Sequence, residues 1–424
     1  MLNKVNYNKI AKVVIILIIV LLGAKEIYQA QKHSDKPSYV AGDGSEVNVI
    51  RGGACYARDG FFSNAGLPDI WCGGRFFPEQ GGQLCGVKFT TNIYKTYPPG
   101  SHMLGGVYAK ICGEYNLGCY RMFPVGLGVF SLVVFALLLL RSLTPVKAAL
   151  IMLAIAVIPM TSNKMHGLQF QSYTLPLFLM YLASLIIFFK HKRRFNIRYF
   201  IFFFLFGAFQ GFLSFDEVFL TTLSGIPVAL LYTPLNNKED IKRLALVVTT
   251  VSAGLFLSYA LHFIQVIIYD GSAGQSYDFL KMMFKERYND TGGGDTLEIN
   301  SMKLAFEMFS QVGRSKEHFI INLPIFLGAV LLLLLIKKGV LTLTLHKPMQ
   351  LCLQWASSRR NFIVILSALL ISFLWIILMK QHVLFHQRYF ARHFFLFYFM
   401  SILTIIENTS LLELKAPSNE ENQE

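Results

Sequence analysis

Two short stretches of the sequence gather ionisable side chains in ways that could support catalysis. In AGDGSEVNVIRGGACYARDGFF, Asp43 and Glu46 are three residues apart and would share one face of a helix. Such a pair can hold a divalent cation or accept the proton of a substrate hydroxyl. Alternatively, Asp43 or Ser45 caps a helix that has Glu46 in its first turn. The sequence leaves both interpretations open and makes Asp43 the first candidate catalytic base, with Glu46 and Asp59 as substitutes.

The second stretch is KQHVLFHQRYFARH, which contains no acidic residue. His382 and His386 are spaced to share one helical face, and Arg388 and Arg392 share another. Arginine matches phosphate oxygens bidentately, and a cationic cluster beside hydrocarbon is costly unless an anion neutralises it. A site for a lipid phosphate, a histidine metal pair and interfacial residues that snorkel to headgroups all fit the pattern. We favour the phosphate site.

Three further positions are candidates for substrate binding. The tandem proline of KTYPPGSHML fixes an extended backbone that could hold Tyr97 against a sugar ring or a membrane edge, although the same motif also makes a simple turn. His166 and the adjacent pair Asp216 and Glu217 lie in other short connections between apolar runs. Ionisable groups at the mouth of a helical bundle can form a site. In such turns, however, we expect an exposed histidine and solvated acids.

The composition shows which kind of element must position these residues. The 424 residues are 54% hydrophobic and only 15% charged, with a mean hydropathy of +0.48. Soluble proteins carry about a quarter charged residues, so an ordinary cytosolic enzyme, a disordered protein and a coiled coil are excluded. The net charge of +14 is spread between apolar runs, which argues against a nucleic-acid partner. The chain is therefore expected to lie in a lipid bilayer.

About ten apolar runs are long enough to cross a bilayer, some of them with the help of snorkelling ends. They are 11-30, 124-141, 146-161, 174-190, 199-214, 217-233, 244-267, 318-336, 362-379 and 394-406. We therefore predict an all-α polytopic membrane protein of about ten transmembrane helices.

Basic residues between the runs predict which ends face the cytoplasm. Lys9 and Lys12 place the N-terminus inside, and the inside connections then include the basic segments 190-198 and 238-243. The connections on the opposite face are poor in basic residues, with the exception of 380-393. Because this turn breaks the charge rule, its basic residues are candidates for function on the extracytoplasmic face.

The largest soluble part is the predicted extracytoplasmic loop 31-123, which holds five of the six cysteines. Five crowded cysteines without histidines at zinc-finger spacing favour an oxidising compartment. Cys112 and Cys119 are close enough for a small disulfide loop, while the other pairings stay open.

Two groups of predicted helices surround a second external segment. The helices of 124-267 and 318-406 flank 268-317, whose two amphipathic stretches predict helices in the headgroup layer. The first run, 1-30, is either a transmembrane anchor or a cleaved signal. The end of the chain, 407-424, is typical of a disordered cytoplasmic tail.

The acidic pair after the first span, the long external loop, ARDGFFSNAGLP, YPPGSHML and the late HxxxHxRxxxRH turn together resemble the GT-C glycosyltransferases. That superfamily includes protein mannosyltransferases, aminoarabinose transferases acting on lipid A and uncharacterised bacterial relatives. The resemblance runs over most of the chain through loose motifs. It implies a polyprenyl-phosphate sugar donor and an essential first-loop carboxylate, which would be Asp43. Arg388 and Arg392 would meet the donor phosphate. Asp43 lies farther from the first span than the key acid in much of that superfamily, and Asp59 is the substitute.

The resemblance also implies transfer to a glycan, lipid or protein acceptor on the extracytoplasmic face of a bacterial inner membrane. Breaking a sugar–phosphate bond needs a base for the acceptor and positive charge for the leaving phosphate. Asp43 would supply the first and the basic turn the second, and Mg²⁺ or Mn²⁺ could bridge Asp43 and the phosphate. We therefore expect an inverting glycosyltransferase that uses at most a divalent cation.

Two other classes of membrane protein are alternatives. A transporter or flippase for a lipid-linked or anionic solute would place ionisable or helix-breaking residues at mid-span in paired halves. Here the charges gather at the outer mouth instead. An O-antigen ligase or polymerase would carry its large external loop late in the chain, whereas this loop comes first.

Overall fold

The structure, a computed structural model, is almost entirely helical. It describes residues 7-34, 45-70, 83-84, 87-88, 93-95, 97-113, 116-157, 165, 167-168, 171-233, 237-288, 359-379 and 391-408. Apart from helices, these residues form one two-residue hairpin, β1 (Gln83–Leu84) with β2 (Val87–Lys88), and an isolated bridge between Asp69 and Ile93. The helical class predicted from the sequence is confirmed.

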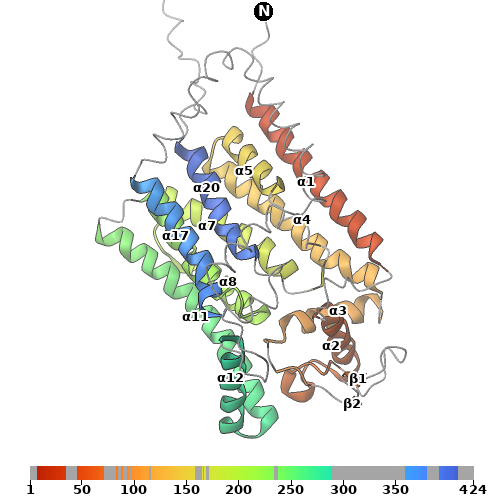
Figure 1. Ribbon diagram of the computed structural model, residues 1–424. Helices are drawn as coiled ribbons and strands as arrows, with labels where there is room; N and C mark the ends of the chain where they lie inside the picture. The colour runs from red at the N-terminus through yellow and green to blue at the C-terminus, as the bar shows by residue number, and fades with distance from the viewer. Residues whose placement is uncertain are drawn as a thin grey trace, which may run out of the picture.

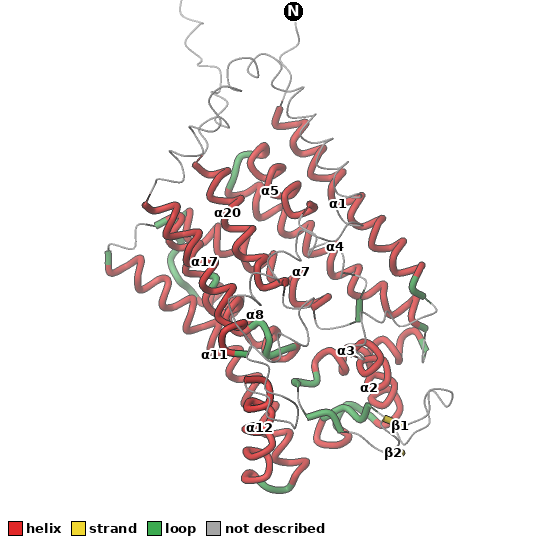
Figure 2. Tube along the Cα trace, viewed as in Figure 1, coloured by secondary structure: helices red, strands yellow, loops and turns green. Residues whose placement is uncertain are grey.

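Apolar helices of different lengths run side by side and form the body of the molecule (Figures 1 and 2). They are α1 (Tyr7–Lys32), α4 (Leu117–Ser142), α5 (Pro145–Val157), α7 (Gln171–Lys190), α8 (Ile197–Leu213), α9 (Val218–Leu223), α10 (Gly225–Tyr232), α11 (Lys238–Asp270), α17 (Arg359–Leu378) and α20 (Phe395–Asn408). A helix lies in each predicted apolar run that the structure describes, and the run 318-336 lies outside the described residues.

Within the described ranges, four helices are long and apolar enough to cross a membrane by length and composition. They are Leu117–Ser142, Ser172–Lys190, Lys238–Asp270 and Arg360–Leu378. The chain is therefore a helical membrane protein, while the number of about ten spans stays a prediction.

The two ends of the bundle differ in structure. At one end, here called the loop end, lie α2 (Ser45–Asp59), the 3-10 helix η1 (Ser63–Gly66), α3 (Gly100–Cys112) and α12 (Ala273–Tyr288) (Figure 1). The opposite end, here called the basic end, holds the last turns of α4 and α7 and the first turns of α5 and α17 (Figure 1). Arg141, Lys147, Lys190 and Arg360 belong to these turns, and Arg193 and Arg194 follow α7 directly. The charge rule predicts that the basic end is cytoplasmic and the loop end external.

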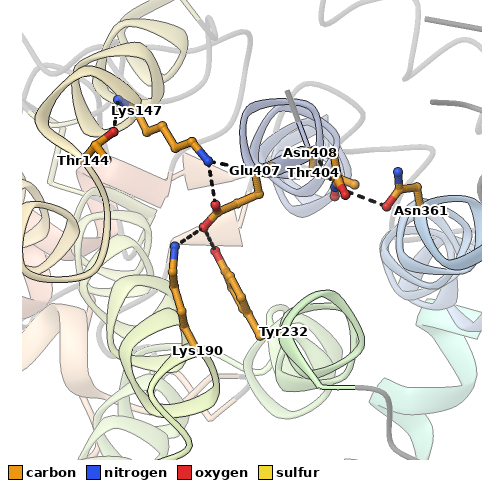
Figure 3. A network of polar contacts seen from close by, with 8 residues as sticks. All are labelled: Thr144, Lys147, Lys190, Tyr232, Asn361, Thr404, Glu407 and Asn408. Atoms are coloured by element: carbon orange, nitrogen blue, oxygen red, sulfur yellow. Dashed lines mark hydrogen bonds and ion pairs between the residues drawn. The ribbon is translucent and has the colours of Figure 1, made fainter. Parts of the chain in front are cut away.

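At the basic end, Glu407 joins four helices through one carboxylate (Figure 3). Lys147 of α5 lies 3.1 Å from Oε2, Lys190 of α7 pairs with Oε1, and the Tyr232 hydroxyl of α10 donates to Oε1 at 2.8 Å. Glu407 itself belongs to α20, so the helix continues into the segment that the sequence predicts as tail. This network fixes the basic end of the bundle.

Helices α8 and α11 pack closely against each other, and glycines let their two backbones approach. A Cβ added at Gly254 would collide with the carbonyl oxygen of Phe204 and lie 2.8 Å from the nitrogen of Ala208. A Cβ added at Gly207 would likewise collide with the carbonyl of Val251. Close backbone approach through small residues is a common way in which membrane helices associate.

We therefore expect Gly254→Ala to lower the free energy of unfolding by about 1–3 kcal/mol, because the added methyl group has backbone atoms as its neighbours. Gly126→Ala is the matched control, since an added Cβ there meets nothing within 4 Å. Thermal melting in detergent compares the two variants. Equal melting temperatures for both would contradict the close crossing.

The Phe-rich helix α8 has one buried face and one exposed face. Phe203 and Phe206 are buried, and the ring of Phe206 stacks on that of Tyr181 in α7 at 4.2 Å between centroids. On the other face, Phe200 and Leu205 are 43% and 58% exposed. Exposed apolar side chains on a membrane helix are suited to contact with acyl chains.

Candidate functional site

The carboxylates of Asp216 and Glu217 are buried at the loop end, in the short connection between α8 and α9. They are only 3% and 7% exposed, so the expectation that these acids are solvated is wrong. The backbone N–H of Asp216 donates to Oγ of Ser214 at 3.0 Å, which tightens the turn directly after α8. Side chains from other elements, among them Tyr97, Thr174 and Tyr259, cover this connection.

Tyr97 brings the first external segment onto this acidic pair. Its hydroxyl lies 3.1 Å from Oδ1 and 3.4 Å from Oδ2 of Asp216 and donates to this carboxylate. Its ring stacks on Phe215 at 6.1 Å and on Tyr94 at 6.2 Å between centroids. The residue predicted to bind substrate is therefore joined to an acid far away in the sequence.

Helices α7 and α8 contribute polar groups beside Glu217. Oγ1 of Thr174 donates to Oε1 of Glu217 at 2.8 Å, and Nε2 of Gln210 donates to the backbone carbonyl of Thr174 at 3.0 Å. Gln210 is 2% exposed, and its Oε1 has no hydrogen-bond partner in the described part of the chain. A buried acceptor without a donor costs free energy, which a ligand hydroxyl bound here would recover.

Helix α11 holds both sides of this arrangement in place. The hydroxyl of Tyr259 donates to the backbone carbonyl of Ser214 at 3.3 Å, and its ring packs edge-on against Phe215 at 4.5 Å. Nε2 of His262 lies 3.0 Å from the carbonyl oxygen of Lys95, two residues before Tyr97. Because α11 contacts the turn and the Tyr97 segment, their relative position is fixed.

A salt bridge strengthens the same attachment. Nζ of Lys95 lies 2.9 Å from Oδ1 of Asp270, at the end of α11, and Oγ of Ser276 donates to Oδ2 at 3.0 Å. Lys95 is half-buried, and its ammonium lies 4.6 Å from the centre of the Phe279 ring in α12. The segment that carries Tyr97 is thus bound to α11 and α12.

The end of the predicted basic turn packs near the acidic pair. Arg392 lies in the 3-10 helix η4 (Ala391–Phe394), and the ring of the next residue, His393, stacks on Trp375 at 6.3 Å. Trp375 in turn contacts Phe219 at 6.0 Å, and Phe219 follows Glu217 by two residues. These aromatic rings therefore place the end of the basic turn beside the connection that holds Asp216 and Glu217, a pairing that the sequence did not predict.

Glu46 takes part in a buried ion pair. Oε1 and Oε2 lie 2.6 and 2.9 Å from Nη1 and Nη2 of Arg121 in α4, and both side chains are at most 1% exposed. The backbone N–H of Leu168 also donates to Oε1 at 3.0 Å, and Nε of Arg121 donates to the carbonyl of His33 at 3.0 Å. A carboxylate with both oxygens occupied by a guanidinium favours a structural role.

The other predicted site residues lie apart from this arrangement or outside the described chain. Asp59 is exposed at the end of α2 and pairs with its neighbour Arg58, with 2.6 Å between Nη2 and Oδ2. Asp43, His166, His382, His386 and Arg388 lie outside the described residues. The predicted convergence of Asp43 with Arg388 and Arg392 stays a prediction.

The prediction of a bridging Mg²⁺ or Mn²⁺ rests on Asp43 and also falls outside the described chain. Among the residues that the structure does describe, no three His, Cys, Asp or Glu side chains gather closely enough to hold a metal ion.

The disulfide predicted between Cys112 and Cys119 is confirmed, with 5.9 Å between their α-carbons. It joins the end of α3 to the first turn of α4. Cys55 on α2 is also disulfide-bonded. Disulfides at the loop end agree with an oxidising compartment on that side of the membrane.

His102 of α3 is a buried histidine that packs beside Tyr94, in the segment that carries Tyr97. It is 4% exposed, its ring is 5.3 Å from that of Tyr94, and neither ring nitrogen has a hydrogen-bond partner in the described structure. Burial away from water disfavours the charged form and lowers the pKa of His102 to about 3 from 6.5. The side chain is therefore neutral at neutral pH.

This burial predicts acid sensitivity. Between pH 6.5 and about pH 3, His102 is protonated in the unfolded chain but stays neutral in the folded chain. Stability should therefore fall by up to about 1.4 kcal/mol per pH unit in that window and be unaffected above it. We expect His102→Leu to flatten the dependence of melting temperature on pH between 6.5 and 4. Parallel curves for His102→Leu and wild type would contradict the assignment.

The sequence contained a signal for Arg121, which was overlooked as the partner of Glu46. Arg121 is a lone cation within the otherwise uncharged stretch LGCYRMFPVGLG, and such a cation requires an acid partner. The burial of Asp216 and Glu217 had no comparable signal, because the segments that cover them are distant in the sequence.

Comparisons with known proteins leave the chain without a family. It matches no family model, no curated protein and no solved structure. The functional proposal therefore depends on the residues at the loop end alone.

Proposed function

We propose that the protein is a membrane glycosyltransferase that moves a sugar from a polyprenyl-phosphate-linked donor to an extracytoplasmic acceptor. We place the reaction at the loop end, around Asp216 and Glu217. The observation that carries this proposal is the buried carboxylate of Asp216, which accepts the hydroxyl of a tyrosine from the first external segment. Buried acids with hydroxyl partners are a frequent feature of active sites.

Asp216 has the properties needed in a base for an acceptor hydroxyl. Its hydrogen bonds to Tyr97, at 3.1 and 3.4 Å, are longer than the roughly 2.5–2.7 Å usual between a hydroxyl and a carboxylate. A substrate hydroxyl can therefore displace Tyr97 at little cost. Glu217 lies beside it, and a carboxylate near the anomeric carbon also stabilises an oxocarbenium-like transition state.

The basic turn would supply the positive charge that the leaving phosphate needs. Arg388 and Arg392 would bind the donor phosphate and neutralise the charge that develops as the sugar leaves. The packing of η4 through Trp375 against Phe219 supports this assignment, because it brings residues 391-394, the described end of this segment, close to the acidic pair. Mg²⁺ or Mn²⁺ held by Asp43 would add to that neutralisation.

A transfer assay tests the proposal directly. Membranes containing the protein are incubated with radiolabelled prenyl-phosphate sugars, and covalent label is sought in the glycan, lipid and protein fractions. We expect label in one fraction, and loss of it in the double variant Arg388→Ala and Arg392→Ala. Movement of the intact labelled donor across vesicles, without covalent transfer, would instead favour a transporter or flippase.

A further inference from the structure

A cavity of about 540 Å³ opens at the basic end, between the last turns of α4 and α7 and the start of α8. Four arginines line it: Arg141, Arg193, Arg194 and Arg198. No acidic side chain is among the described residues that line it. The cavity lies at the opposite end of the bundle from the acidic pair, so it is separate from the proposed active site.

These arginines are not neutralised within the described structure. None of the four forms a salt bridge there, whereas the nearby Lys147 and Lys190 both pair with Glu407 (Figure 3). Four guanidinium groups around one cavity repel one another, and that repulsion is relieved when an anion binds between them.

The backbone around the cavity is well ordered by local hydrogen bonds. Oδ1 of Asn196 caps α8 by accepting the N–H groups of Arg198 and Tyr199 at 3.1 and 3.3 Å. The backbone N–H of Arg193 donates to the carbonyl of Phe188 at 2.9 Å, which folds the connection back on α7. The positive N-terminal end of α8 thus adds to the field of the arginines.

Exposed apolar side chains lie on α4 and α8, the same helices that line part of the cavity. Leu137, one turn before Arg141, is 60% exposed, and Ile197 and Ile201 of α8 are 67% and 47% exposed. In a membrane protein such side chains face acyl chains. A ligand with a phosphate for the arginines and a hydrocarbon part for this surface fits both features.

We propose that this arginine cavity binds phosphate, supplied by the headgroup of an anionic phospholipid in the leaflet at the basic end. The volume is within the roughly 300–1,000 Å³ of small-molecule sites and exceeds what one phosphate fills. Four arginines carry more charge than one phosphodiester neutralises. The site therefore prefers a lipid with two phosphates over one with a single phosphate.

The protein in nanodiscs of zwitterionic phosphatidylcholine, with measured additions of cardiolipin or phosphatidylglycerol, tests this inference. Native mass spectrometry counts bound lipids, and thermal melting reports stabilisation. We expect the double variant Arg194→Gln and Arg198→Gln to bind cardiolipin about tenfold to thirtyfold more weakly than wild type. Phosphatidylglycerol should bind more weakly than cardiolipin to wild type.

Lys192→Gln is the matched control, because Lys192 belongs to the same connection but does not line the cavity. It should bind cardiolipin as wild type does, and all three proteins should melt together in phosphatidylcholine alone. If Lys192→Gln weakens cardiolipin binding as much as the double variant does, the effect comes from surface charge in general and the proposed site is wrong. Equal stabilisation by inorganic phosphate or glycerol phosphate would overturn the lipid as its source.

Discussion

Replacement of Asp216 by asparagine should lower the initial rate of sugar transfer by about 10²–10⁴-fold, the range that a general base contributes. Asparagine keeps the shape of the side chain and can still accept the Tyr97 hydroxyl, but it cannot take the acceptor's proton. The melting temperature should therefore change little while turnover is lost. The rate is measured in membranes with a radiolabelled prenyl-phosphate sugar, at equal amounts of folded protein.

Asp278→Asn provides the matched control. Asp278 is an exposed carboxylate of α12 at the same end of the molecule, and its loss should leave the rate unchanged. Tyr97→Phe should retain activity, because the phenol only occupies the position of the acceptor hydroxyl. If Asp43→Asn or Asp59→Asn abolishes transfer while Asp216→Asn remains active, the base belongs to the first loop and our assignment is wrong.

The second large effect concerns stability. Glu46→Gln should lower the free energy of unfolding by about 3–5 kcal/mol, because it leaves the guanidinium of Arg121 buried without a counter-charge. Chemical or thermal unfolding in detergent measures the loss. Transfer activity per folded molecule should stay close to that of wild type if the role of Glu46 is structural.

A double variant distinguishes the loss of the ion pair from nonspecific destabilisation by each substitution. Glu46→Leu combined with Arg121→Met removes both charges, and we expect it to be more stable than either single variant. If the double variant is as unstable as the sum of the single ones, the two side chains act independently and the ion pair is not what holds α2 on α4.

Much of the fold could be predicted from local patterns. Apolar runs predicted the helices, because burying a hydrogen-bonded backbone in lipid leaves few other choices. The short spacing of Cys112 and Cys119 likewise predicted their disulfide. Both features depend on residues that are close together in the chain, where spacing limits the possible geometry.

The partners of the polar residues could not be predicted in the same way. Tyr97 was a candidate, but Asp216 is 119 residues away from it, and only packing of α11 against both segments brings them together. Glu46 has the spacing of a partner for Asp43, yet its carboxylate pairs with Arg121, 75 residues later. Spacing along a helix describes one face and leaves open which distant element covers it.

Photo-crosslinking at position 97 tests the central claim most directly, because it asks where the donor binds. Tyr97 is replaced by a photoreactive phenylalanine derivative, and the membranes are illuminated with a radiolabelled prenyl-phosphate sugar. We predict a labelled protein that unlabelled donor competes away, and no label with the same substitution at the exposed Tyr277 of α12. Absence of label at position 97, or equal label at both positions, would contradict a donor site at the acidic pair.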